Sequence, residues 1–225
     1  MSKRTRSVFS FDHGVFDLDG TLVDSMGACT GIFARLVASR GVDPDAATRS
    51  YLSNTTRSLE ETFRETLAEH GAEHEDETVA RMMLWFAELI KREHLDFFPG
   101  AKRLVRRLKE AGKTLFVSSG SPDEVVCRRL GAERIKGLFQ LVLGSTDIVK
   151  GREHIRLFAE EAGLTTAEFG RAGFLIGDLE LDMMIARETG LYGIGVATTI
   201  SAERLRAAGA RRIIPDIKTL LSDPV

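Results

Sequence analysis

The chain has 225 residues, which is enough for one or two domains with a sizeable core. Its 31 lysines and arginines nearly balance 33 aspartates and glutamates, so the formal charge of -2 excludes a global field that would recruit nucleic acid or an anionic membrane. No run of 18 apolar residues and no apolar N-terminal stretch occur. We therefore expect a cytoplasmic protein, with Cys29 and Cys127 as reduced thiols.

The first predicted element is a short strand that ends in the run Asp17-Leu18-Asp19-Gly20-Thr21. Side chains two positions apart share one face of an extended strand, so Asp17 and Asp19 point together. Two such carboxylates require a counter-ion, and their hard oxygen ligands suit Mg²⁺. Gly20 permits a tight turn, and Thr21 places a hydroxyl beside it. A calcium loop is excluded because its closing glutamate is missing, whereas an ordinary strand-to-turn exit remains an alternative at this point.

The next region has no strand pattern and is expected to be an all-helical insert. Its predicted helices run from Ser25 to Gly41, over 45–52, over 59–69 and over 79–90. We therefore predict one domain formed by residues 1–21 and 97–225, and a second domain formed by 22–96. His70 and His74 have the spacing of a metal-binding pair, but acidic neighbours indicate a solvated loop.

From residue 97 onward, predicted strands alternate with predicted helices. The helices are expected at 101–111, 121–130, 153–162, 181–189 and 202–208, and the strands at 113–117, 139–143, 174–176, 192–196 and 213–214. Apolar strands in such alternation are typical of a parallel sheet covered by helices. We therefore predict an α/β fold, a doubly wound parallel sheet with a Rossmann-like core, which the helical insert interrupts after the first strand.

Polar residues come after the second strand of this sheet. Ser118 and Ser119 lie directly beyond its apolar residues, Ser121 and Glu124 have capping-box spacing, and Pro122 suits the first helical position. A helix that begins here presents free amides, so Ser118 and the Ser119 amide are predicted to cradle a phosphate. A plain serine-rich turn is the alternative.

A lysine and two further acids come after the later strands. Lys150 precedes a predicted helix, where a cation opposes the helix dipole and therefore suggests a bound anion. Asp178 emerges at a strand end, and Asp182 lies at the start of the next helix. Ligands of such sheets bind beyond the carboxyl ends of the strands, so these acids are placed beside those of the first strand. The alternatives are a solvated lysine and an aspartate that only caps a helix.

Taken together, these residues resemble the four motifs of the haloacid dehalogenase superfamily. The matching motifs are Asp17-x-Asp19-Gly20-Thr21, Ser118, Lys150 and Gly177-Asp178-x-x-x-Asp182, and the resemblance extends from about residue 14 to residue 221. Phe98-Pro99-Gly100-Ala101 and Gly209-Ala210 are similar to the phosphoglycolate phosphatase and β-phosphoglucomutase branch. Leu179 and Gly151 depart from the usual pattern without removing a catalytic group.

The resemblance implies a role for each of these residues. Asp17 is implied as the nucleophile that forms an aspartyl-phosphate, and Asp19 as the general acid and then the base. Mg²⁺ is implied to be held by Asp17, Asp19 through its carbonyl, and Asp178, while Asp182 supports the metal or Lys150 from outside. The implied catalytic set is Asp17, Asp19, Ser118 and Lys150, and the implied substrate-binding residues are Thr21, Ser119 and Arg57.

The implied function is a Mg²⁺-dependent phosphatase, a phosphoric monoester hydrolase that acts on a small phosphorylated metabolite. Asp19 favours this reaction because the dehalogenases of the superfamily lack the second aspartate. A sugar-phosphate mutase and a binding protein that has lost catalysis are the alternatives. The insert resembles a helical cap, and Arg57 lies in a loop similar to the substrate-contacting loop of the mutase. We expect a monomer or weak homodimer without nucleic-acid or membrane partners.

Overall fold

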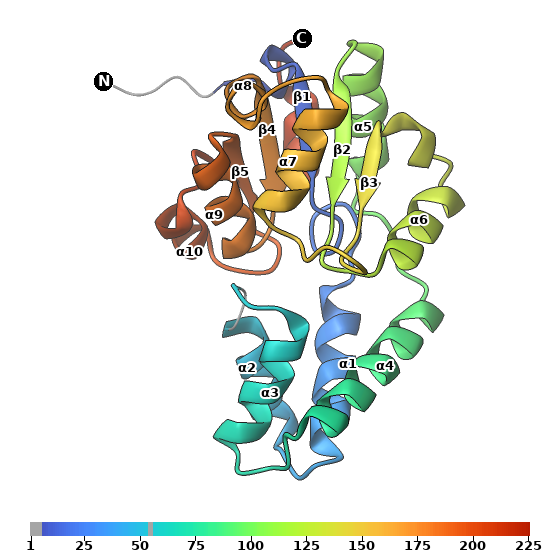
Figure 1. The fold of residues 1–225 in the computed structure, drawn as a ribbon. Helices are drawn as coiled ribbons and strands as arrows, with labels where there is room; N and C mark the ends of the chain where they lie inside the picture. Colours follow the sequence, from blue (N-terminus) through green and yellow to red (C-terminus); the bar gives the residue numbers. More distant parts are fainter. Residues whose placement is uncertain (1–5, 54–55) are drawn as a thin grey trace. The chain divides into compact units, whose positions relative to one another are not determined.

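The computed structural model describes residues 6–53 and 56–225, and it contains one sheet and two sets of helices (Figure 1). The chain separates into two units: one comprises the residues up to Asp24 together with Phe97–Val225, and the other is Ser25–Asp96. The sequence interpretation placed the first division after residue 21. Leu22 and Val23 belong to the first unit, where the Leu22 carbonyl accepts from the Phe98 amide at 2.9 Å.

The first unit is built on six parallel strands in the order β3-β2-β1-β4-β5-β6, which confirms the predicted doubly wound parallel sheet. The strands are β1 (His13–Phe16), β2 (Thr114–Ser118), β3 (Leu141–Leu143), β4 (Gly173–Gly177), β5 (Tyr192–Val196) and β6 (Arg212–Ile214). β1 lies between β2 and β4, with Val15 opposite both Phe116 and Leu175. The strand order therefore reverses at β1, which is where ligands bind in such sheets.

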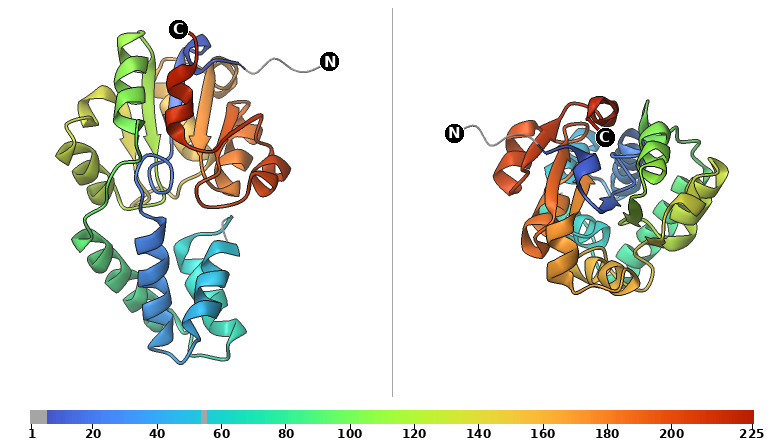
Figure 2. Two further views of the ribbon diagram at one scale, coloured as in Figure 1. Left: turned by 180° about the vertical axis from the view of Figure 1, so that it is seen from behind. Right: turned by 90° about the horizontal axis from the view of Figure 1, so that it is seen from above.

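Helices cover both faces of this sheet. They are α5 (Ala101–Glu110), α6 (Asp123–Ala132), α7 (Arg152–Glu161), α8 (Thr166–Ala172), α9 (Glu180–Thr189) and α10 (Ala202–Ala208), with 3-10 helices η1 (Val8–Ser10), η2 (Lys136–Leu138) and η3 (Ile217–Ser222). Seen from behind, α5 and η3 lie on the face opposite α7 (Figure 2). Phe116 of β2 packs on Phe158 of α7, with ring centroids 4.9 Å apart. Burying each such ring contributes about 2 kcal/mol to folding.

The second unit has its own core of helices. They are α1 (Met26–Ala38), α2 (Pro44–Ser53), α3 (Leu59–Glu69) and α4 (Asp76–Arg92). The rings of Phe33 and Phe63 stack at 4.6 Å between centroids, and Phe86 meets Phe63 edge-on. A capping box of Ser58 and Glu61 begins α3. Across both described stretches of the chain, every helix is too short or too polar to cross a membrane.

Several predicted elements differ from the structure. Helix α8 was not predicted, although Thr165 and Glu168 form a capping box that marks its start. Strand β3 begins at Leu141 and not at 139, because η2 and its exit occupy the preceding residues. The predicted capping box of Ser121 and Glu124 is wrong: α6 begins at Asp123 without a side-chain cap, and the Ser121 hydroxyl donates to Asp19.

Gly177 provides a test of how tightly α9 approaches the sheet. A Cβ atom at this position would lie 2.2 Å from Cγ of Asp182, so Gly177→Ala displaces that carboxylate and should lower the free energy of unfolding by about 1–3 kcal/mol. Gly31, an exposed glycine inside α1 with open space around it, is the matched control, and Gly31→Ala should raise stability by about 0.5–1 kcal/mol. Chemical denaturation measures both changes. A Gly177→Ala protein as stable as the wild type would contradict the close approach.

Candidate active site

Acids from two neighbouring strands meet at the carboxyl edge of the sheet. Asp17 directly follows β1 and Asp178 directly follows β4, and these strands pair with Phe16 opposite Ile176. The Asp17 amide extends this pairing, because it donates to the Ile176 carbonyl at 2.9 Å. Asp182 comes from the first turn of α9, and carboxylate oxygens of the three acids all lie within 4.8 Å of one another. All three side chains are buried, and we call them the acid cluster.

Lys150 places one ammonium between two acids of this cluster. Its Nζ lies 2.7 Å from Oδ1 of Asp17 and 2.6 Å from Oδ1 of Asp182, and the lysine side chain is only 7% exposed. The loop before α7 is fixed by Ser145, whose hydroxyl accepts from the Lys150 amide and donates to the Ser119 carbonyl, both at 2.9 Å. The lysine is therefore tied through its backbone to the end of β2 and through its side chain to β1 and α9.

The charges of the acid cluster do not balance. Burial raises the pKa of Asp17 to about 6, Lys150 opposes this rise, and Asp182 adds to it. Burial, together with the charges of Asp17 and Asp182, also raises the pKa of Asp178 well above its ordinary range. Burial alone would lower the pKa of Lys150, but the two acids beside it raise that pKa and keep the ammonium charged. One ammonium therefore faces three buried carboxyl groups.

Two oxygens of the acid cluster are suited to a metal ion. Oδ2 of Asp17 and Oδ2 of Asp178 are buried, and within residues 6–53 and 56–225 neither accepts a hydrogen bond. A buried carboxylate oxygen without a partner is costly unless it is neutralised or binds a cation. Hard carboxylate oxygens are the ligands that Mg²⁺ and Ca²⁺ prefer. The donor set therefore fits a divalent cation.

Neighbouring groups set the orientation of the acids. The fully buried Thr21 donates its hydroxyl proton to Oδ1 of Asp178 at 3.0 Å. Asp182 Oδ2 accepts from the Leu179 amide at 3.2 Å, which holds this acid at the start of α9. Gly20 has a φ of 82°, in the left-handed region that favours glycine, and so turns the chain from β1 toward Thr21. Thr21, which was predicted to bind substrate, is thus engaged with Asp178.

Asp19 lies outside this cluster and is held from the side of α6. Its Oδ1 accepts from Arg129 Nη1 at 2.5 Å, and its Oδ2 accepts from the hydroxyls of Ser121 at 2.7 Å and Ser119 at 3.4 Å. The side chains of Arg129 and Asp19 are 9% and 16% exposed. Among the ion pairs of the described residues, none joins Lys150 to Asp19. The two acids of the first motif therefore have different cationic partners.

The neighbouring serines at the end of β2 also have different partners. Ser118 Oγ lies 2.9 Å from Nδ1 of the buried His154, and His154 Nε2 lies 3.0 Å from the Ile148 carbonyl. Burial lowers the pKa of His154, which favours the neutral ring. A carbonyl only accepts, so Nε2 carries the proton and Nδ1 accepts from Ser118. The Ser119 hydroxyl instead accepts from the Ser121 amide at 3.0 Å.

Arg57 lies in the helical unit, where it forms an ion pair with Glu65 on α3. Its side chain is 44% exposed. The loop that suggested a substrate contact includes positions 54 and 55, which lie outside the described residues. Within its own unit, the guanidinium of Arg57 is therefore already engaged by an acid.

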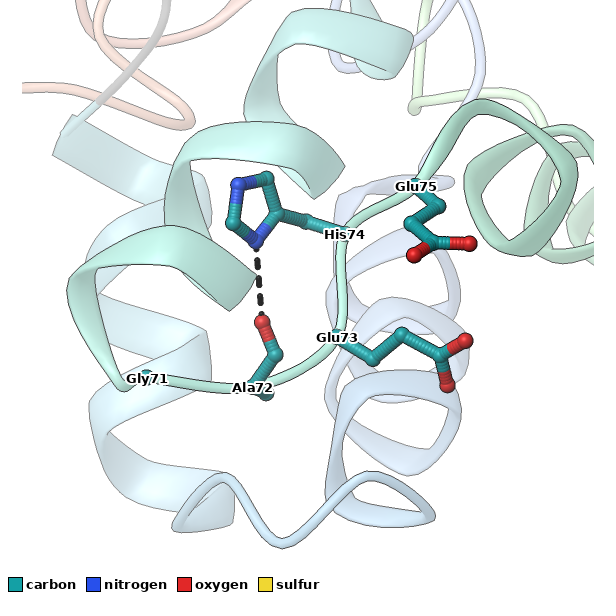
Figure 3. A pocket seen from close by; sticks show the side chains of 5 residues that line it. All are labelled: Gly71, Ala72, Glu73, His74 and Glu75. Atoms are coloured by element: carbon teal, nitrogen blue, oxygen red, sulfur yellow. Dashed lines mark hydrogen bonds between the residues drawn. The ribbon is translucent and has the colours of Figure 1, made fainter.

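The histidine spacing in the helical unit does not form a metal site. His74 lies in a pocket of about 300 Å³ formed by the turn of residues 71–75, and its Nδ1 is 3.0 Å from the Ala72 carbonyl (Figure 3). His70 Nδ1 lies 2.9 Å from the Thr66 carbonyl. Each ring therefore has one nitrogen beside a carbonyl of its own local backbone.

Three residues of the site were missed by sequence reasoning. Arg129 follows another arginine on α6 and is 110 residues from Asp19, so no local pattern marks it. Ser121 was assigned to a helix cap. His154 bonds to Ser118, which is 36 residues away, so no local pattern marks it either.

The raised pKa of Asp17 predicts how the stability of the metal-free protein depends on pH. The pKa of Asp17 is about 6 in the folded protein and 3.8 in the unfolded chain. The resulting contribution to stability is fully present below pH 3.8 and is lost as pH rises through about 6. The difference between 3.8 and about 6, at roughly 1.36 kcal/mol per unit, corresponds to about 3 kcal/mol. We expect the free energy of unfolding in chelator to fall over this range, and Mg²⁺ to restore it above pH 6 but not near pH 4.

Asp17→Asn is the control for this pH dependence. His13 and His154 have lowered pKa values, so their contribution to the free energy of unfolding rises with pH. The informative quantity is therefore the difference in the free energy of unfolding between wild type and Asp17→Asn at each pH. Denaturant titrations at several pH values measure it. A wild-type curve parallel to that of Asp17→Asn would contradict the raised pKa.

Comparisons with known proteins agree with this geometry. The family model described as haloacid dehalogenase-like hydrolase matches residues 15–196. The Dickeya dadantii protein named "Probable phosphatase IndB" is 28% identical over 214 residues, which cover 89% of this chain and 87% of that protein. The phosphoglycolate phosphatase of Pseudomonas putida is 24% identical over 92% of this chain and 77% of its own length.

The fold is also shared with solved structures. A structure described as a predicted phosphoglycolate phosphatase from Haemophilus somnus superposes with a TM-score of 0.78 and 18% identity, over 94% of this chain and 97% of that one. The family match spans both units and includes the acid cluster and Lys150. The resemblance predicted from the four motifs is thus confirmed, and the chain belongs to the haloacid dehalogenase-like hydrolase family.

Proposed function

We propose that the protein is a Mg²⁺-dependent phosphatase that releases phosphate from a small phosphorylated metabolite through an aspartyl-phosphate on Asp17. The observation that carries this proposal is the Asp17 carboxylate, whose Oδ1 is bound by Lys150 while its buried Oδ2 has no described hydrogen-bond partner. Membership of the family and the two relatives named as phosphatases support the reaction class.

The proposed reaction has two steps. In the first, an oxygen of Asp17 attacks phosphorus, the bond from phosphorus to the leaving oxygen breaks, and Asp19 gives its proton to that oxygen. In the second, Asp19 takes a proton from water, the water oxygen attacks phosphorus, and the bond to Asp17 breaks. Inorganic phosphate leaves, and both acids return to their starting states.

Charge repulsion is the main obstacle to the first step. A carboxylate and a phosphoryl oxygen about 4 Å apart repel by about 4 kcal/mol at an effective dielectric constant of 20. The Lys150 ammonium, 2.7 Å from Asp17, offsets part of this repulsion, and Asp182 holds the ammonium in place. Mg²⁺ held by Asp17, Asp178 and the Asp19 carbonyl would supply the remaining neutralisation when bound.

We assign the contact with the phosphoryl group to Ser119 and not to the neighbouring Ser118. The Ser118 proton is committed to His154, so this hydroxyl has no proton left to donate to a phosphoryl oxygen. The Ser119 hydroxyl accepts from a backbone amide and faces Asp19, so its proton can turn to a phosphoryl oxygen. In this proposal, Ser118 and His154 form a buried hydrogen-bonded pair that stabilises the end of β2.

The helical unit Ser25–Asp96 is proposed to act as the cap that excludes water from the reaction and selects the substrate. It has an independent core, which suits a part that moves as a rigid body. Arg57 contributes to substrate binding in this proposal only if a ligand displaces Glu65 from it.

The first test measures phosphate release from a panel of phosphorylated metabolites with and without Mg²⁺. We expect Mg²⁺-dependent release, and we expect Asp17→Asn to reduce it at least about a thousandfold because the amide is a poor nucleophile. Asp12→Asn, at an exposed position just before β1, is the matched control and should retain activity. Isomerised sugar phosphate without free phosphate would indicate a mutase, and no turnover of any compound would indicate a binding protein.

The second test separates the two serines. Ser119→Ala should lower kcat/KM by about tenfold or more, because a hydrogen bond to a charged phosphoryl oxygen is lost. Ser118→Ala should leave KM nearly unchanged and should instead lower stability, because the buried Nδ1 of His154 loses its donor. Steady-state kinetics and thermal unfolding of both variants provide the measurements. A large loss of kcat/KM in Ser118→Ala and only a small loss in Ser119→Ala would show that Ser118 makes the phosphoryl contact.

A further inference from the structure

Arg129 has a single polar partner among the described residues, and that partner is Asp19. Nη1 lies 2.5 Å from Oδ1 of the acid, whereas Nη2 is buried and makes no hydrogen bond. The arginine side chain is only 9% exposed. Arginine is seldom buried to this degree unless a charge is paired with it. The buried guanidinium is therefore directed at one carboxylate.

Both carboxylate oxygens of Asp19 accept hydrogen bonds from α6 or from the residues just before it. Opposite Arg129, the Ser121 hydroxyl donates to Oδ2 at 2.7 Å. Ser121 lies just before α6 and Arg129 lies on it, and α6 is anchored to the neighbouring loop because Asp123 accepts from the Gly144 amide at 2.8 Å. One contact from α6 and one from the residues just before it leave the carboxylate little freedom to rotate.

A second cation is bound by the other acid of the first motif. Asp19 is two residues from Asp17, and the Asp17 carboxylate already binds Lys150. Without Arg129, the Asp19 side chain would be free to turn toward Lys150 and toward any cation in the acid cluster. There it would act as one more ligand of these cations, and not as a proton carrier for the leaving oxygen.

We infer that Arg129 is a positioning residue, which keeps the Asp19 carboxylate beside the acid cluster and available for proton transfer. The inference rests on the proposed function, because it gives Asp19 the role of general acid. Among the described residues, Arg129 bonds to Asp19 and not to the proposed nucleophile Asp17. Its whole effect on the reaction passes through Asp19, and this property separates it from a residue that binds substrate or only stabilises the fold.

The experiment compares two leaving groups in the Arg129→Met variant, which keeps the apolar part of the side chain. The leaving group of p-nitrophenyl phosphate departs without a proton, whereas the leaving group of an alkyl phosphate must be protonated. The alkyl phosphate used is the one that the wild-type enzyme hydrolyses fastest in a panel that includes 2-phosphoglycolate. We expect kcat/KM, which reports transfer to Asp17, to fall about ten- to a hundredfold for the alkyl phosphate and less than about threefold for p-nitrophenyl phosphate. Arg129→Lys should recover part of the loss, and Arg106→Ala, at an exposed arginine of α5, should change neither rate.

A double-mutant cycle with Asp19→Asn tests whether Arg129 acts through Asp19. In the Asp19→Asn background, Arg129→Met should lower kcat/KM for the alkyl phosphate by less than about twofold, because the group that it positions is already lost. A crystal structure of metal-free Arg129→Met should show the Asp19 carboxylate displaced from the Ser121 hydroxyl. This second readout requires no activity.

Three outcomes overturn the inference. Equal losses for both leaving groups would indicate a structural role, and additive losses in the double mutant would indicate a direct role in binding substrate. An unmoved Asp19 carboxylate in the variant crystal would show that Arg129 does not position it. A wild-type enzyme that hydrolyses neither compound with Mg²⁺ would overturn the proposed function itself, which the other three outcomes leave intact.

Discussion

Three buried carboxyl groups share one ammonium at the carboxyl edge of the sheet, and the surrounding structure keeps them together despite their repulsion. Asp17 and Asp178 are fixed by adjacent parallel strands, so neither can move apart without breaking the sheet. Lys150 offsets only part of the negative charge, and Oδ2 atoms of both strand acids stay without a described hydrogen-bond partner. A site built in this way holds unfavourable electrostatic energy in the free protein, which a bound divalent cation would relieve.

The structure divides its acids between two cations. Lys150 pairs with Asp17 and Asp182, whereas Arg129 pairs with Asp19, although Asp19 is only two residues from Asp17 in the chain. The division gives the proposed nucleophile and the proposed proton carrier separate surroundings. It depends on α6, which carries Arg129, and on the loop before α7, which carries Lys150.

Two consecutive serines at the end of β2 have different hydrogen-bond partners. Ser118 turns toward α7 and donates a hydrogen bond to His154, while Ser119 faces Asp19. His154 in turn is held by the Ile148 carbonyl, so its tautomer is set by the backbone. A buried, neutral histidine fixes Ser118, whereas Ser119 contacts Asp19 and the Ser121 amide, and this contrast rests on the alternation of side chains along an extended chain.

The sequence by itself determined the family, the parallel sheet and the residues of the acid cluster. Strand periodicity is a local property, and parallel strands bring their carboxyl ends to one edge, so Asp17, Asp178 and Lys150 were identified from their positions just beyond predicted strands or before a predicted helix. Only the tertiary structure decided that Arg129 pairs with Asp19 and that Ser121 bonds to the same acid and caps no helix. These contacts join segments about a hundred residues apart, and neither an arginine on a helix nor a serine just before one carries a local signal of the distant carboxylate that it contacts.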